Sequence, residues 1–307
     1  MEKFSKSLKL MGNNFTFTVV SDDLLFAQEN IEAAIEETRR IEALFTTYNN
    51  ESQTNLINNN AGIKPVKVSE EVFNLIERSI GISKITQGAF DITYGSIDKS
   101  LWNFDKTMTS LPSEEHALKM VHLINYKNII LNKDEQTVFL KEKGMRIGFG
   151  GIGKGYAAEM AKNLLLKNKV KSGIINASGD LTAWGLQPNG KPWTIGIANP
   201  DYPQEAFSYL EISGKAIATS GNYEKYLLID GKKYSHTINP KTGLPITGIK
   251  SVTIISNNAE FADAMATPIA VMGIKAGLFL INQLPHLHCI IIDDNNKVFT
   301  SKNIHLT

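Results

Sequence analysis

The sequence predicts an α+β fold in which mixed sheets pack against helices. Near the N-terminus, Phe15, Phe17 and Val19 alternate with two threonines, which is typical of a half-buried strand. Residues 24–45 instead carry apolar side chains at the spacing of one helix face. Because helices and strands do not alternate regularly along the rest of the chain, an α+β fold is favoured over a doubly wound parallel sheet.

Further elements are expected along the remaining chain. A helix should begin after Ser69, a typical N-cap residue that two glutamates follow, and end near Gly88. Residues 128–131 and 137–141 flank a Lys-Asp-Glu turn and predict a hairpin. The later elements are expected as helices over 156–166 and 259–272, and as strands over 173–176, 194–198, 209–212 and 287–292. Because no internal repeat or clear linker is present, residues 1–307 are interpreted as one domain, which can consist of two closely packed lobes.

The composition is that of an ordinary globular protein. Apolar residues make up 42% of the 307 residues and charged residues 21%. The net charge is +1 and like charges form no long run, so charge does not favour nucleic acid or an anionic membrane as a partner. The single cysteine, Cys289, lies in an apolar run and is expected to be a buried, unreactive thiol.

Membrane insertion and export are not indicated by the residues. No stretch is long and apolar enough for a membrane span. Residues 1–10 are too polar for the apolar part of a secretory signal. The sequence as given therefore predicts a cytoplasmic protein, and the periplasm or cell envelope is the alternative if the chain has been trimmed.

Residues 148–155 read Gly-Phe-Gly-Gly-Ile-Gly-Lys-Gly and differ by one residue from a phosphate-binding P-loop. Gly148, Gly153 and Lys154 fit that pattern, whereas Gly155 stands where Ser or Thr normally supplies a hydroxyl to Mg²⁺. The segment can still bind a diphosphate through backbone N–H groups and the lysine. Any metal ligand must then come from another part of the chain.

Asp263 and Thr267 are the candidates for that metal site. They are four residues apart in a predicted helix, so their side chains leave one face of it, one turn apart. A carboxylate and a hydroxyl are hard oxygen donors of the kind that Mg²⁺ prefers. The surrounding helix is small or apolar, and a buried carboxylate needs a cation or a donor as partner. The alternative is that Asp263 only caps a helix or forms local hydrogen bonds.

Other polar loops are possible ligand contacts, although none is specific alone. Asp91 follows a predicted helix end and can equally form an Asx turn. Asp180 follows a strand, and Ser220 lies in a similar Thr-Ser-Gly loop. His236, on the shoulder of a turn, is either a structural group or a general base, because histidine changes its protonation near neutral pH.

Taken in order, these segments resemble the FAD:protein FMN transferases, the ApbE family. The resemblance extends from Met11 to about Gly273 and covers most of the chain. Any one matching segment is weak, whereas their common order makes a chance resemblance very improbable. The segments are Met11-Gly12-Asn13, Thr46-Thr47-Tyr48 with Ser52-Gln53, Gly88 to Thr93 with Leu101-Trp102, Gly148 to Tyr156, Ser178-Gly179-Asp180, Ser220-Gly221-Asn222-Tyr223, His236 to Gly243, and Ala262 to Thr267.

The resemblance implies a fold and a reaction. The fold would be the ApbE-like flavin transferase fold, with mixed sheets, packed helices and an FAD cleft between two lobes. Family members take FAD as donor, cleave its pyrophosphate with Mg²⁺ as cofactor, attach FMN through a phosphoester to a Thr or Ser of a flavoprotein, and release AMP. The implied acceptors are subunits of Na⁺-translocating NADH:quinone reductase, of Rnf-type complexes or of related flavoproteins.

The resemblance also implies roles for single residues. His236 would be the base that activates the acceptor hydroxyl, and Lys154 would face the diphosphate. The side chains of Asp263 and Thr267, with the backbone carbonyl of Gly151, would hold Mg²⁺. The residues that would contact FAD are Met11, Tyr48, Ala89, Phe90, Asp91, Gly148, Lys154 and Thr237.

Some positions depart from the family pattern. Gln53 stands where many members have Glu, and Glu159 stands where Asp is common. Ala266 occupies a position where some relatives have a further Asp. One carboxylate fewer near the metal predicts weaker metal affinity or a site for a single Mg²⁺.

Three other functions stay open on the sequence alone. An FAD diphosphatase would use the same site with water as the acceptor. A non-catalytic flavin-binding protein would take up FAD without turnover. A P-loop NTPase is disfavoured by Gly155 and by the lack of a Walker B context.

Overall fold

A computed structural model of the chain describes all residues except 99–109, 203–204, 222–225, 303 and 305–307. Four residues of the segments that resemble the family, Leu101, Trp102, Asn222 and Tyr223, lie outside the described residues. Among the described helices, none combines the length and hydropathy that a membrane crossing requires.

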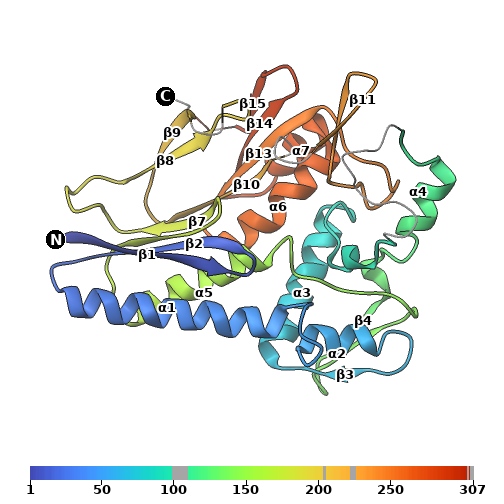
Figure 1. The fold of residues 1–307 in the computed structure, drawn as a ribbon, viewed down its shortest axis with the longest axis horizontal. Helices are drawn as coiled ribbons and strands as arrows, with labels where there is room; N and C mark the ends of the chain where they lie inside the picture. Colours follow the sequence, from blue (N-terminus) through green and yellow to red (C-terminus); the bar gives the residue numbers. More distant parts are fainter. Residues whose placement is uncertain (99–109, 203–204, 222–225, 303, 305–307) are drawn as a thin grey trace.

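An eight-stranded sheet forms the larger part of the fold (Figure 1). Its neighbouring strands are antiparallel throughout. The alternation at Phe15, Phe17 and Val19 belongs to the second strand, where all three side chains are fully buried. The strands, in spatial order, are β1 (Glu2–Leu10), β2 (Asn13–Ser21), β6 (Gly173–Ala177), β7 (Asp180–Trp184), β10 (Lys215–Gly221), β13 (Ile249–Ser256), β14 (His288–Asp293) and β15 (Val298–Thr300). The predicted α+β class is confirmed.

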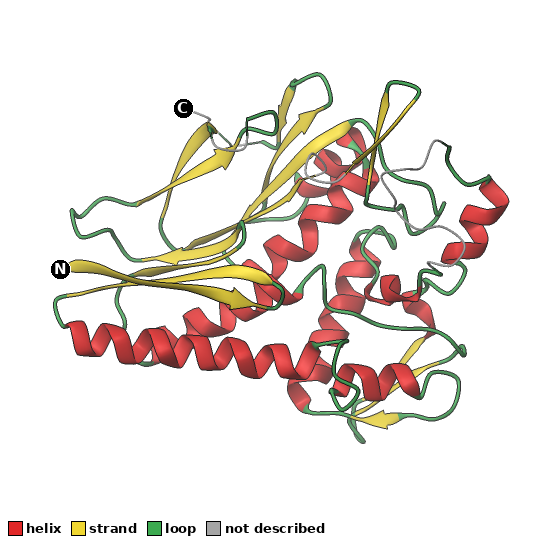
Figure 2. Cartoon of the chain, viewed as in Figure 1, coloured by secondary structure: helices red, strands yellow, loops and turns green. Residues whose placement is uncertain are grey.

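Helices pack against one face of this sheet (Figure 2). They are α1 (Leu24–Phe45), α5 (Gly153–Lys167), α6 (Ala259–Met272) and α7 (Ile274–Ile281). The bounds predicted for α1 and α6 from their apolar spacing are confirmed. Helix α5 begins three residues earlier than predicted, at Gly153, so Lys154 and Gly155 belong to its first turn.

A two-stranded ribbon, β8 (Trp193–Ala198) and β9 (Ala206–Ile212), packs against the opposite face of the sheet. Ile217 of β10 contacts the ribbon cluster, whereas the adjacent Ala218 belongs to the helix-side core. Successive side chains of a strand point to opposite faces, so the ribbon and the helices lie on different sides. The ribbon turn is held by Lys250, whose Nζ donates to Asp201 at 2.7 Å and to Asn296 at 2.6 Å.

A smaller group of elements lies beside the end of α1. It contains α2 (Gln53–Asn59), α3 (Glu70–Ile85), η1 (Ile92–Ser96), α4 (Glu114–Val121), η2 (Tyr126–Asn128), and a sheet of β3 (Val66–Lys67), β5 (Thr137–Leu140) and β4 (Ile129–Asn132). The helix that starts after Ser69 and the β4–β5 hairpin confirm the predictions for these regions. A separate hairpin, β11 (Tyr226–Ile229) and β12 (Lys232–Ser235), leads to His236.

Candidate active site

A cavity of about 600 Å³ lies beside the N-terminus of α5. Its walls come from the glycine-rich segment, the β6–β7 turn, β8, β10, the loop after β12, and α6. Among the predicted site residues, the cavity lining contains Gly151, Lys154, His236, Asp263 and Thr267. The fold therefore brings Asp263 and Thr267 to the same cavity as Lys154, which lies more than a hundred positions earlier in the sequence.

Helices α5 and α6 cap each other where they meet. The carboxylate of Asp263 in α6 accepts the N–H of Gly155 at 2.9 Å, and also the N–H of Lys154. In return, Glu159 of α5 accepts the N–H of Ala259, the first residue of α6, at 2.9 Å. The first N–H groups of a helix have no intrahelical partner and favour negative charge, so both carboxylates stabilise a helix start. The predicted meeting of Asp263 with the glycine-rich segment is confirmed by this contact.

The same junction explains Gly155. A Cβ atom at this position would lie 2.2 Å from the carbonyl oxygen of Ala259 and 2.6 Å from Cβ of Asp263. No side chain fits at those distances, so α5 and α6 can approach each other only with glycine here. The residue that breaks the Walker pattern is therefore required by helix packing.

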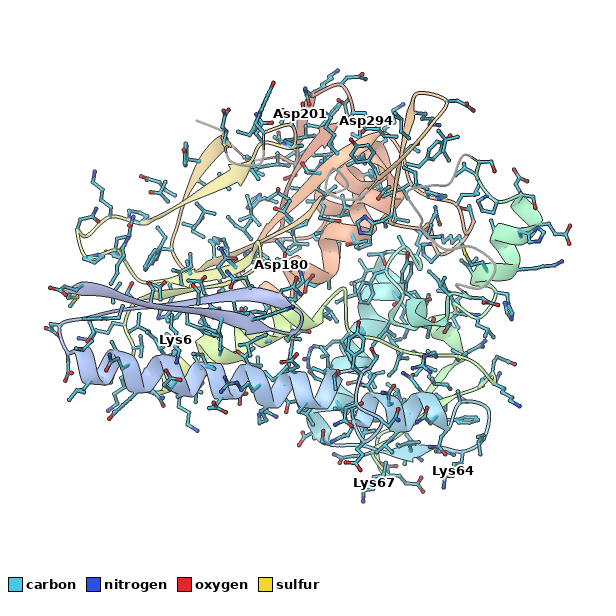
Figure 3. All side chains as sticks on the ribbon, viewed as in Figure 1. Lys6, Lys64, Lys67, Asp180, Asp201 and Asp294 are labelled. Carbon is cyan, nitrogen blue, oxygen red and sulfur yellow. The ribbon has the colours of Figure 1, made fainter. Side chains whose placement is uncertain are left out.

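Lys154 extends from the first turn of α5 to Asp180 at the start of β7, with which it forms an ion pair. Asp180 is only 3% exposed and also accepts the backbone N–H of Thr219. Figure 3 shows Asp180 close to the place where α5 and α6 meet. Burial raises the pKa of Asp180, while Lys154 acts in the opposite direction. The sequence marked Asp180 only as a loop residue, because its pairing with Lys154 depends on the strand order.

The two buried carboxylates influence each other. Burial, together with the charge of Asp180, raises the pKa of Asp263 to about 7, while Lys154 and the backbone donors lower it. Two acidic groups thus share one lysine as their counter-ion.

The described residues hold no group of three or more His, Cys, Asp or Glu side chains that could hold a metal. A cation bound here must therefore also use hydroxyl or carbonyl oxygens.

Oxygen donors of that kind are present beside Asp263. Thr267 lies one turn further along α6, and its hydroxyl donates to Ser220 at 3.3 Å. Gly151 lines the same cavity from the loop before α5. Carboxylate, hydroxyl and carbonyl oxygens next to an excess of buried negative charge fit the preferences of Mg²⁺. The small side chain of Ala266 also lines the cavity and adds no donor.

The glycine-rich segment contributes fewer free N–H groups than its sequence suggests. The N–H of Gly148 donates to Ile92, and the N–H of Gly153 donates to Phe149. The N–H groups of Gly150 and Gly151 have no acceptor within the described part of the chain, and both residues line the cavity. Backbone binding of a phosphate here is thus limited mainly to these two residues.

Several residues expected to contact FAD lie outside this cavity. They are Met11, Tyr48, Ala89, Phe90, Asp91, Gly148 and Thr237. Phe90 and Met11 still lie against the glycine-rich segment, because a Cβ at Gly151 would be 3.6 Å from the ring of Phe90 and a Cβ at Gly153 would be 3.5 Å from Cε of Met11. Tyr48 is 99% exposed at the end of α1.

Asp91 and Thr237 have partners within the fold. One oxygen of Asp91 accepts the N–H of Thr93 at 2.8 Å, and the other accepts the N–H of Tyr126 at 2.8 Å. This is the Asx turn that the sequence allowed as an alternative. Burial raises the pKa of Asp91, while the donors of Thr93 and Tyr126 lower it. Thr237 is buried and its N–H donates to Ser235 at 2.9 Å.

His236 is exposed and lines the cavity from the loop that follows β12. Two residues later, the N–H of Ile238 donates to the hydroxyl of Tyr94 at 3.0 Å. Burial raises the pKa of Tyr94, so this hydroxyl stays neutral. The histidine therefore projects from a fixed loop at the wall of the cavity.

Sequence reasoning missed part of the cavity wall. The missed part is formed by residues 194–198 of β8, whereas Asn13, Asn176 and Thr219 belong to segments that the sequence singled out without giving these residues a role. Residues 194–198 were predicted as a strand, but their position over the cavity follows from the packing of the ribbon on the sheet. Gln53, one of the departures from the family pattern, has a structural contact, since its side chain accepts the N–H of Ser69 at 2.7 Å.

An α+β fold with a lysine, a histidine and paired buried carboxylates around one cavity is suited to group transfer from a phosphate-bearing substrate. The class can be stated more closely from known proteins. The sequence matches the ApbE family over residues 11–291, and the chain belongs to that family.

Relatives with a shared name support the same class. An FAD:protein FMN transferase of Klebsiella pneumoniae is 30% identical over 300 residues, which are 97% of this chain and 92% of the relative. An Escherichia coli K12 protein of the same name is 29% identical over 271 residues, covering 86% of this chain and 77% of the relative. The chain is accordingly an enzyme of the flavin transferase class.

Solved structures agree with this assignment. A crystal structure of an ApbE protein from Thermotoga maritima has a TM-score of 0.87 and 30% identity, and covers 98% of this chain and 97% of that one. The apo form of the flavinyl transferase ApbE from Pseudomonas stutzeri has a TM-score of 0.84 and 25% identity, and covers 98% of this chain and 96% of that one. The predicted fold is therefore confirmed.

Proposed function

We propose that this protein cleaves FAD and attaches FMN by a phosphoester bond to a Thr or Ser of a target flavoprotein, releasing AMP, with Mg²⁺ as cofactor. One observation carries the proposal beyond family membership. The 2.9 Å contact between Asp263 and Gly155 brings the oxygen donors of α6 to the glycine-rich segment and Lys154. This is the juxtaposition that cleavage of a diphosphate requires.

The diphosphate of FAD would be held at the start of α5. The N–H groups of Gly150 and Gly151, which have no acceptor among the described residues, support this role, and the Lys154 ammonium supplies a positive charge. Lys154 would exchange part of its contact with Asp180 for phosphate oxygens. Asp263, Thr267 and the Gly151 carbonyl would hold Mg²⁺, which when bound offsets negative charge on the diphosphate.

His236 would act on the acceptor. Its imidazole takes the proton from the Thr or Ser hydroxyl as that oxygen forms a bond to the phosphorus of the FMN moiety. The bond from this phosphorus to the bridging oxygen breaks, and AMP leaves with that oxygen. An exposed histidine suits this role because the second substrate is a protein that cannot enter the cavity.

The rest of the flavin would extend beyond the cavity. Phe90 and Met11 lie against the glycine-rich segment, which would hold the diphosphate. Contacts of FAD with Met11, Tyr48, Ala89, Phe90, Asp91, Gly148 and Thr237 are therefore retained as proposals. A subunit of Na⁺-translocating NADH:quinone reductase, of an Rnf-type complex or of a related flavoprotein is the proposed acceptor.

The test is mass spectrometry of such a subunit after incubation with the protein, FAD and MgCl₂. We expect the mass of FMN to be added to one Thr or Ser, with one AMP released for each FMN attached. Release of AMP with no acceptor present would identify an FAD diphosphatase. Tight FAD uptake with no AMP would identify a non-catalytic flavin-binding protein.

Asp263→Ala provides the matching variant test. Turnover should fall at least about a hundredfold because Mg²⁺ would lose its charged ligand and with it its position at the diphosphate. Circular dichroism should show that the variant is folded, and Asp22→Ala, which removes an exposed carboxylate, is the control. Unchanged Mg²⁺-dependent turnover in Asp263→Ala would exclude the proposed site.

A further inference from the structure

A second cavity, of about 360 Å³, is lined in part by Pro240 and Lys241, which follow His236 in the same loop. It is bounded by the C-terminal end of α3, by η2, and by the residues that follow His236. Tyr126 and Pro240 form part of its wall. Its lysines have no role in the reaction described above, whereas Asp91, which also lines the cavity, is one of the proposed FAD contacts.

Three lysines from separate segments meet at this basic cavity. Lys84 is in the last turn of α3, Lys127 is in η2, and Lys241 follows Pro240. All three are exposed, and within the described residues none of them forms an ion pair or a side-chain hydrogen bond. Asp91 also lines the cavity, but both of its oxygens already accept hydrogen bonds. The net charge of the chain is only +1, so the positive charge here is local.

The basic cavity has a fixed position relative to His236. Lys241 follows the histidine by five residues, which limits their separation to about 18 Å even in a fully extended chain. The loop between them is anchored at Tyr94, and Gly243 packs so closely on α4 that a Cβ there would lie 2.0 Å from the carbonyl oxygen of Ala117. Lys241 itself reaches the end of α3, because a Cβ at Gly88 would lie 3.8 Å from its Cε.

We propose that the basic cavity docks an acidic segment of the acceptor protein and so presents the acceptor hydroxyl to His236. This inference rests on the proposed function, because it assigns the site that the protein substrate would use. A protein acceptor needs contacts outside the FAD cavity, and these three lysines, which have no ion-pair partner within the described part of the chain, supply them. Charge complementarity of this kind selects partners and speeds association.

The test measures binding without turnover. The probe is a fluorescein-labelled peptide with one Thr between two runs of Glu, compared with the same peptide carrying Gln in place of Glu. Fluorescence anisotropy at low salt should show that the Glu peptide binds at least about tenfold more tightly than the Gln peptide. The triple variant Lys84→Gln, Lys127→Gln and Lys241→Gln should lose this preference.

A second triple variant controls for charge alone. Lys64, Lys67 and Lys133 are also exposed and do not line the basic cavity, and Figure 3 shows Lys64 and Lys67 at the lower edge of the molecule. Their replacement by Gln should leave peptide binding unchanged, and neither triple variant should change the affinity for FAD. The binding test does not depend on the activity test described above. If the protein failed to transfer FMN in that test but still bound the Glu peptide, the proposed function would be contradicted and the docking site supported.

Three results would overturn the docking site. Equal binding of the Glu peptide by wild type and by the first triple variant would make the lysines ordinary solvated surface. Displacement of the peptide by FAD, or weaker FAD binding in that variant, would assign the cavity to the donor. Displacement by millimolar phosphate, where sodium chloride of equal ionic strength has no effect, would identify a site for small anions.

Discussion

Asp263 combines a structural and a chemical role in one carboxylate. It accepts the N–H groups of Lys154 and Gly155 in the first turn of α5, which fixes the position of the Lys154 backbone. It also faces Asp180 across the lysine, so the junction holds more negative than positive charge. The physical consequence is a site whose charge balance depends on pH when no cation is bound.

The free energy of unfolding, measured without divalent cations, should fall as the pH rises from about 4 to about 7. In the folded protein, burial raises the pKa of Asp263 to about 7, whereas an unfolded Asp has a pKa of about 3.9. The folded state therefore keeps a proton that the unfolded chain releases. This contribution is complete below about pH 4 and is lost as the pH passes 7, at up to about 1.4 kcal/mol per pH unit.

Urea unfolding of wild type and of Asp263→Asn at several pH values between 4 and 8 checks this expectation. The carboxamide has nearly the same shape as the carboxylate and does not titrate. The variant should lose most of the pH slope. An identical slope in both proteins would show that other groups cause it.

His236→Ala should lower the rate of transfer by about a hundredfold or more, because a positioned general base typically contributes that much. The affinity for FAD should change little. Although the His236 side chain lines the cavity, it is exposed and is proposed to act on the acceptor hydroxyl and not on FAD. The measurement compares flavin transfer with equilibrium FAD binding by fluorescence. Parallel losses in both would reassign His236 to ligand binding.

The α5–α6 junction depends on one glycine. Gly155→Ala should reduce stability by about 3 kcal/mol or more, because the added methyl group would overlap the backbone of Ala259 and force the helices apart. Gly81 in α3 is the matched control, since a Cβ there has open space around it. Gly81→Ala should be neutral or stabilising by up to about 1 kcal/mol.

Chemical denaturation of both variants gives the comparison. Loss of turnover should accompany the loss of stability in Gly155→Ala, because Lys154 and Asp263 would move apart. If Gly155→Ala were as stable as Gly81→Ala, the close packing of the two helices would not be what selects glycine at this position.

The elements differ in how far the sequence predicts them. The bounds of α1 and α6 follow from apolar spacing and from capping by Asp23 and Asn258, both of which are local. The start of α5 was misplaced because glycines have poor helix propensity, and its cap, Asp263, lies 108 residues away. β13 was not predicted because it is buried on both faces and shows no alternation.

The candidate site likewise contains residues that the sequence predicts and contacts that only the fold reveals. Gly151, Lys154, His236, Asp263 and Thr267 could be named from motifs, and they meet in one cavity. The pairing of Lys154 with Asp180 and the position of β8 over the cavity could not be named, because they depend on strand order and ribbon packing. The three lysines of the basic cavity come from separate segments, so no local pattern joins them.

The two parts of the molecule share one apolar core. Phe17 of β2 and Ile41 of α1 belong to the same buried cluster as Leu75 of α3 and Val138 of β5. Polar contacts cross the same boundary, since Arg78 of α3 donates to Glu260 of α6 at 2.7 Å. Such continuity implies that the smaller group of elements does not unfold by itself.

Leu75→Ala tests this cooperativity. The fully buried side chain lies in α3, so its truncation should cost about 2–5 kcal/mol. In a Trp102→Phe background, fluorescence reports only Trp184 and Trp193, which are buried near the ribbon. If the core is one cooperative unit, the fluorescence transition in urea must shift by the same free energy as the circular dichroism transition.

Leu56→Ala, in the exposed part of α2, is the control and should shift neither transition by more than about 0.5 kcal/mol. The informative comparison is between the two probes in Leu75→Ala. A circular dichroism curve that splits into two steps, with fluorescence unchanged from the background protein, would mean that α3 and its neighbours unfold independently. The lysines of the basic cavity and His236 would then belong to units that can move relative to each other, and a fixed docking geometry could not be maintained.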